Sequence, residues 1–352
     1  MIAIIIFLQL VMGLLQSPTI YFRHFFQLRH EVLAYFLFRD AAKRGILWQE
    51  TDVSKVIECR EQGNLRKLGG ASAEGIRSYL NLSFKSYEQK YAITPDPTAQ
   101  LADRFDAIIT TAYQQTGMQV VVLIDEYDSP LQHSWKTPEH EECTNVYRNV
   151  FAILKADDEY ERFVFITGIT KFTQISLFSV LNNLTNISFL PEYAAICGIT
   201  EEEIGENFKP ELERMAEVNG WTLQQTHDNL KDYYDGYHFS RKNMVDVYNP
   251  FSLLNALDTQ DLSCFWVSSG ATSMLPKFVD NMELRLRNFE HCPILRKTLE
   301  SSDVINGGTE LFLYQTGYLT IKSSDEFGYF LGFPNQEVKQ ALYEVVLPTS
   351  RY

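Results

Sequence analysis

An acidic pair, Asp125 and Glu126, directly follows the apolar run VVVLI at residues 120–124. An unbroken β-branched run is typical of a strand buried on both faces, and a carboxylate at its end can hold the water shell of a Mg²⁺ ion. A glutamate beside it can polarise an attacking water. The pattern therefore predicts that Asp125 binds the metal and that Glu126 orients water. The alternative is structural, because acidic residues also suit a loop or the start of a helix.

A polar segment, TGITK at residues 167–171, follows a second apolar run, FVFI at residues 163–166. In ATPases with an extra strand inserted beside the acidic one, a polar residue at this strand end senses the γ-phosphate and aligns water. Thr167 and Thr170 are candidates for that role, and Lys171 is a candidate for contact with anionic phosphate. Thr-Gly at a strand end is also ordinary turn chemistry, so this segment alone leaves both interpretations open.

Cysteine and histidine supply no further site. The five cysteines are scattered and never form Cys-x-x-Cys, and the seven histidines include no His-x-x-x-His pair. This pattern indicates inert thiols in a reducing compartment, and it disfavours both a disulfide framework and a zinc site. We therefore expect a cytoplasmic protein.

Charge and hydropathy disfavour two classes of partner. The net charge of −14 repels phosphate backbones, and no run of Lys and Arg offsets it, so we expect no general nucleic-acid binding. Residues 1–22 carry no charge and could meet a membrane, but polar residues and a proline at 16–18 interrupt the apolar stretch. A signal peptide would also begin with basic residues. We therefore expect no membrane contact. A membrane-anchored protein that uses residues 1–22 is an alternative interpretation.

The elements that would position the acidic pair alternate between helix and strand. Apolar residues keep helical spacing over 76–91, 101–112, 146–154 and 175–184, and Gly117 stands where a helix should end. The runs at 120–124 and 163–166 fall between these helices. This order predicts an α/β fold with a parallel sheet and crossover helices, in which the two strands lie side by side and Asp125 ends one of them.

The sequence after residue 198 changes character. Thr200 to Glu203 and Thr222 to Gln225 are capping-box patterns, and the second predicts a helix that ends near Gly236. Two apolar runs, LFLY at 311–314 and YLTIK at 318–322, suggest a hairpin. The turn formers at 235–236 and 249–250, with the aromatic residues around them, are interpreted as turns and packing, and His238 as a turn histidine.

Six segments, taken in order, resemble the bacterial AAA-ATPase-like family, and the resemblance covers residues 69–348. The segments are LIDEYDSPL, FITGITKFTQISLFSVLNNLTNIS, YAAICGIT, YYDGYHFS, VYNPFSLLNAL and LFLYQTGYLTIK. The resemblance implies a P-loop NTPase-like α/β domain at 69–198, a helical, winged-helix-like domain at 199–322 and a tail at 323–352. Residues 1–68 are expected to be atypical for the family.

The same resemblance implies a function. Asp125 and Glu126 match the family's Walker B pair, and residues 167–171 match its sensor segment. ATP and Mg²⁺ are the implied cofactors, and ATP hydrolysis would drive a partner protein or an attached effector. The competing interpretation is a scaffold protein that keeps the surfaces of the fold without turnover.

Two departures from the family bear on activity. Members usually carry a loop ending in Gly-Lys-Ser that holds the phosphates, and no glycine of this sequence is followed by lysine. We therefore expect ATP hydrolysis at background. We also expect segment 1–68 to be loosely held and not to occupy the place of the missing phosphate-loop strand, for which residues 3–15 are the only local candidate. Segment 1–68 is either genuine or the product of a truncated or frame-shifted gene. Members also commonly continue into a PD-(D/E)xK nuclease domain. The one Glu-x-Lys here, Glu337 to Lys339, is predicted on a helix, where it could not serve one metal.

Overall fold

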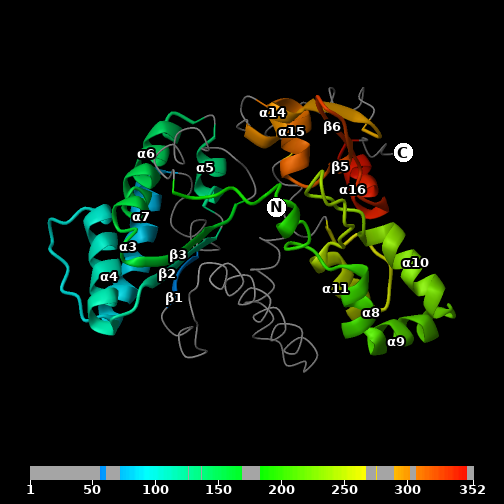
Figure 1. The fold of residues 1–352 in the computed structure, drawn as a ribbon, viewed down its shortest axis with the longest axis horizontal. Helices are drawn as coiled ribbons and strands as arrows, with labels where there is room; N and C mark the ends of the chain where they lie inside the picture. The colour runs from blue at the N-terminus through cyan, green and yellow to red at the C-terminus, as the bar shows by residue number, and fades with distance from the viewer. Residues whose placement is uncertain are drawn as a thin grey trace, which may run out of the picture. The chain divides into compact units, whose positions relative to one another are not determined.

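The computed structural model describes residues 56–60, 72–125, 127–135, 137–168, 183–266, 275, 289–301 and 307–346. These residues form two compact units, an N-terminal unit up to residue 185 and a C-terminal unit from residue 186 (Figure 1). No helix among the described residues is long and apolar enough to cross a bilayer.

The N-terminal unit contains a parallel sheet of three strands. These are β1 (Val56–Arg60), β2 (Val120–Asp125) and β3 (Glu161–Ile166), in the order β1-β2-β3. The register pairs Ile124 of β2 with Ile166 of β3, so both strands end at the same edge of the sheet. This confirms the prediction that the two apolar runs are neighbouring parallel strands and that Asp125 ends one of them.

β1 comes from the segment that we expected to be loosely held. Its five residues pair in parallel with β2, from Val56 opposite Val121 to Arg60 opposite Asp125. Residues 3–15, the candidate substitute strand, lie outside the described residues. β1 pairs along one edge of β2 and β3 pairs along the other, so neither edge of β2 is left unpaired.

Three helices pack together beside this sheet. They are α3 (Ala73–Lys90), α4 (Leu101–Thr116) and α6 (His140–Phe151), joined by the shorter α5 (Ser129–Ser134) and α7 (Ile153–Ala156) (Figure 1). α4 ends at Gly117, whose φ of 64° suits glycine and confirms the predicted stop. The apolar faces meet in stacked rings of Phe84 and Phe105. Most of the helix expected at 175–184 lies outside the described residues.

The C-terminal unit begins with four helices. These are α8 (Glu201–Asn207), α9 (Lys209–Asn219), α10 (Leu223–Tyr234) and α11 (Pro250–Thr259). Both predicted capping boxes are present: Thr200 caps α8 with Glu203, and Thr222 caps α10 with Gln225. In each box the hydroxyl accepts a backbone N–H that the first turn of a helix leaves without an internal partner.

The rest of this unit corrects the predicted hairpin. Its antiparallel sheet contains β4 (Cys292–Leu295), β5 (Thr320–Ser324) and β6 (Gly328–Gly332), in the order β4-β6-β5, with helices α14 (Arg296–Ser301), α15 (Gly308–Gln315) and α16 (Gln336–Val346). The run at 311–314, expected as a strand, lies on α15, because four apolar residues fit a buried helix as well as a strand. The hairpin partner of β5 is β6. Residues expected as a tail therefore supply a central strand and a helix.

Candidate functional site at the carboxyl ends of β2 and β3

The backbone joins the ends of β2 and β3 beyond their last paired residues. The Thr167 N–H donates to the Ile124 carbonyl at 2.8 Å, and the Tyr127 N–H donates to the Thr167 carbonyl at 3.1 Å. These two bonds place the 125–127 segment beside Thr167. The sensor segment and the acidic segment therefore start from one edge of the sheet, as the sequence predicted, and parallel sheets place ligands at this edge.

Asp128 and Gly168 pack tightly where these segments continue. The Asp128 side chain is fully buried, and its Oδ2 accepts a hydrogen bond of 2.7 Å from Gln132 Nε2. A Cβ atom on Gly168 would lie 2.5 Å from Asp128 Oδ1 and 2.5 Å from the Tyr127 ring. Only glycine fits without a shift, so this position fixes the distance between the two segments. No local sequence pattern indicates this contact, since Thr-Gly is common in turns.

Among the predicted site residues, only Thr167 has a side chain that the structure describes. Thr167 is described and buried, at 5% exposure, in the position proposed for a sensor residue. The side chain of Asp125 and the whole of Glu126, Thr170 and Lys171 lie outside the described residues. Metal binding by Asp125, water orientation by Glu126 and phosphate contact by Thr170 and Lys171 therefore stay predictions.

The residue types at this edge fit half of a Mg²⁺–nucleotide site. Carboxylate and hydroxyl oxygens are the ligands and hydrogen-bonding groups that Mg²⁺ and its water shell require, and residues 125, 126 and 167 supply them. The phosphate half needs backbone N–H groups and a lysine in a glycine-rich loop. No Gly-Lys pair occurs in the sequence, so the residues present do not fit that half.

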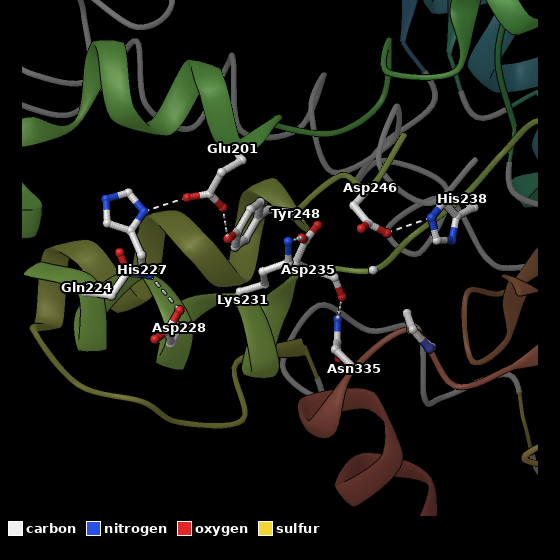
Figure 2. A network of polar contacts seen from close by, with 12 residues as sticks. Glu201, Gln224, His227, Asp228, Lys231, Asp235, His238, Asp246, Tyr248 and Asn335 are labelled. Carbon is white, nitrogen blue, oxygen red and sulfur yellow. Dashed lines mark hydrogen bonds and ion pairs between the residues drawn. The ribbon is translucent and has the colours of Figure 1, made fainter. Parts of the chain in front are cut away.

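A second concentration of polar groups lies in the C-terminal unit, around the turn at Asp235 and Gly236. Gly236 has a φ of 94°, and a Cβ there would meet the Pro334 carbonyl oxygen at 2.4 Å. Asn335 Nδ2 donates to the Asp235 carbonyl at 3.0 Å (Figure 2). Lys322 Nζ donates to the Gly236 carbonyl at 3.3 Å. The turn thus ties the end of α10 to β5 and to the start of α16. This confirms the packing interpretation of the segment.

Ionisable side chains surround the same turn. His238 Nε2 lies 2.6 Å from Asp246 Oδ1, while Glu201 contacts both His227 and the Tyr248 hydroxyl (Figure 2). Burial raises the pKa of Asp235 to about 6. Burial also lowers the pKa of His238, against the opposing effect of Asp246. His238 is therefore a histidine with a carboxylate partner in a packed turn, and the described residues include no group of side chains that could hold a metal ion.

The Glu-x-Lys pair lies on α16, as predicted. Glu337 is fully buried, and its Oε1 accepts backbone hydrogen bonds from Phe265 at 2.7 Å and Trp266 at 2.8 Å. The Lys339 side chain instead forms an ion pair with Glu290, in which Nζ lies 2.6 Å from Oε1. The two side chains therefore do not converge on one point, and the helix excludes a nuclease-type pair here.

The structure is that of a mixed α/β protein with a small parallel sheet. A family model described as predicted AAA-ATPase matches residues 22–178, in agreement with the resemblance that the motifs indicated. The match includes β1 and begins well before residue 69. The expectation that residues 1–68 lie wholly outside the family is therefore corrected for residues 22–68.

A relative from Azotobacter chroococcum mcd 1 extends the similarity further along the chain. It is described as an uncharacterized protein in the vnfD 5′ region, and it is 33% identical over 249 residues. The aligned part is 69% of this chain and 46% of the relative, so the chain spans about half the length of that protein. No solved structure matches the chain.

Proposed function

We propose that this chain is a P-loop NTPase-like protein that retains the acidic half of an ATP site and hydrolyses ATP at no more than background. The observation that supports this most is the hydrogen-bonded junction of residues 124 and 127 with Thr167. It brings the acidic segment and the sensor segment to one edge of a parallel sheet, inside the part of the chain that matches the AAA-ATPase-like family.

The strand order is compatible with an inserted sensor strand. β2 has β1 on one edge and β3 on the other, so a phosphate-loop strand could pair only at the outer edge of β1 or β3. In the inserted-strand arrangement it would lie beside β3, because the sensor strand then stands between the acidic strand and the phosphate loop. Among the described residues no strand pairs with that edge of β3.

Each residue of the site has a proposed role. Asp125 would hold the water shell of Mg²⁺, which supplies charge neutralisation for the phosphates when bound. Glu126 would orient the attacking water, Thr167 or Thr170 would donate a hydrogen bond to a phosphate oxygen, and Lys171 would face phosphate charge. In a family member with an intact phosphate-binding loop, hydrolysis would drive a protein partner or an attached effector.

Impaired hydrolysis follows from the missing phosphate-binding loop. In enzymes that transfer phosphoryl groups, catalysis consists almost wholly of positioning and electrostatic stabilisation. Loss of a single stabilising donor commonly costs roughly 10²–10³ in kcat. A site without several backbone N–H donors and the lysine should therefore have no measurable turnover.

The second candidate function is a scaffold protein that uses the surfaces of the fold and binds no nucleotide. Binding of ATP to the purified full chain, measured by calorimetry with Mg²⁺ and with EDTA, separates the two. The ATP-site proposal predicts binding that is stronger with Mg²⁺, weakened by Asp125→Asn and unchanged by the control Glu141→Gln, since Glu141 is exposed on α6. Absence of binding under both conditions would favour the scaffold.

A further inference from the structure

A group of acidic residues gathers where α7 ends and β3 begins, at the opposite end of the sheet from the candidate site. Asp157 caps the C-terminus of α7, and Glu161 is the first residue of β3. Besides burial, the charge of Asp106, on α4, raises the pKa of Asp157, and Asp158 and Glu159 complete the group. We refer to these five residues as the β3 acid cluster.

Two members of the cluster are buried without polar partners. Glu161 is 8% exposed and Asp157 is 5% exposed. Among the described residues, neither carboxyl oxygen of Glu161 has a hydrogen-bond partner, and Asp157 Oδ2 has none either. An ionised carboxylate is very costly in such surroundings, whereas the neutral acid costs much less.

The charges around the cluster increase this preference for the protonated form. Burial raises the pKa of Glu161 to about 8, and the nearby carboxylates of Asp157 and Asp158 raise it further. Burial and then Asp106 raise the pKa of Asp157 to about 7.

Few other groups face the cluster. Tyr113 of α4 packs its ring against Tyr160 at 5.2 Å. The basic residues of the adjoining elements are Lys155, exposed on α7, and Arg162, which follows Glu161 at an irregularity in the pairing of β2 with β3. Neither donates a hydrogen bond to the carboxyl oxygens of Glu161 in the described part of the chain.

We propose that the β3 acid cluster is a pH-sensitive latch, which holds α4 against the start of β3 while Asp157 and Glu161 are protonated and loosens this end of the sheet when they ionise. Ionisation releases one proton from each group and leaves adjacent negative charges without a cation. The latch acts on the strand that carries Thr167 at its other end, although it does not depend on nucleotide binding.

The sign of the effect follows from linkage. The folded-state pKa values of Asp157 and Glu161 lie above the ordinary values of unfolded chains. The stabilisation is therefore fully present below about pH 4, the unfolded pKa, and is lost as the pH rises through about 7 and 8. Between the unfolded and folded pKa values, each carboxyl group increases the opening equilibrium by about tenfold per pH unit.

Hydrogen exchange on the full chain tests the latch locally. Exchange would be measured by mass spectrometry from pH 6 to 9 in peptides covering 101–125 and 157–166, with correction for the intrinsic pH dependence of exchange. We expect the opening equilibrium of these peptides to rise several-fold per pH unit in the wild type. Glu161→Gln, a neutral side chain of similar shape, should reduce this slope, and Glu141→Gln should leave it unchanged.

Two results would overturn the proposal. One is a corrected opening equilibrium in the wild type that is independent of pH or falls as the pH rises. The other is an unchanged slope in both Glu161→Gln and Asp157→Asn. If neither variant folds, the wild-type slope decides alone, because a protein without the latch would show no rise in these peptides.

Discussion

Replacement of Glu337 tests how the C-terminal unit holds its last helix. The fully buried carboxyl accepts two backbone N–H groups through Oε1, at 2.7 and 2.8 Å, and Trp266, one of the donors, is itself fully buried. In Glu337→Ala both N–H groups lose their acceptor, and each unsatisfied buried donor costs about 1–3 kcal/mol. We expect the free energy of unfolding to fall by about 2–5 kcal/mol. The cavity left by the side chain adds to the loss, and the relief from burying a carboxyl group offsets part of that addition.

Glu337→Gln separates the hydrogen bonds from the charge. Its amide carbonyl can accept the same two N–H groups, so we expect it to lie within about 1 kcal/mol of the wild type at pH 6. Burial raises the pKa of Glu337 to about 7. The wild type therefore loses stability relative to the glutamine variant as the pH rises from the unfolded value through about 7.

Urea titration followed by tryptophan fluorescence measures both effects, since the Trp266 ring contacts the Tyr318 ring at a centroid distance of 4.7 Å and reports on this unit. The midpoint and slope of the transition give the free energy. A loss below about 1 kcal/mol in the alanine variant would refute the reasoning, since it is less than one buried donor is worth. Equal losses in the alanine and glutamine variants would also refute it.

Two glycines give further predictions, with Gly205→Ala as the common control because a Cβ there meets nothing within 4 Å. Gly236→Ala should destabilise the C-terminal unit by about 2 kcal/mol or more in thermal unfolding, from its φ of 94° and the contact with the Pro334 carbonyl. Gly168→Ala should separate residues 167–168 from Asp128, and it should lower the melting temperature and any Mg²⁺-dependent ATP affinity together. A melting temperature equal to that of the control would contradict either prediction.

The sequence predicted those elements whose defining residues lie close together in the chain. The capping boxes at Thr200 and Thr222, the glycine stop at residue 117 and the two buried strands all depend on neighbours in sequence. The adjacency of β2 and β3 was also predictable, because a helical crossover between two buried strands normally returns to the same sheet.

Other features depend on contacts that no local pattern contains. Gly236 meets residue 334, and Glu337 receives hydrogen bonds from residues 265 and 266. The run at 311–314 was ambiguous by itself, and its place on α15 is decided by packing. Likewise, the burial of Glu161 could not be predicted from the sequence, since an acidic residue at a strand start is ordinarily solvated.

Phosphate release from ATP by the purified full chain tests the central claim most directly, namely that the acidic half of the site is present and the phosphate-binding half is missing. The assay would run with Mg²⁺ at saturating ATP, alongside Glu126→Gln and the exposed control Glu141→Gln. We predict that all three proteins release phosphate at the rate of ATP in buffer. A clear wild-type rate that Glu126→Gln abolishes and Glu141→Gln preserves would contradict the account, because another segment would then be holding the phosphates.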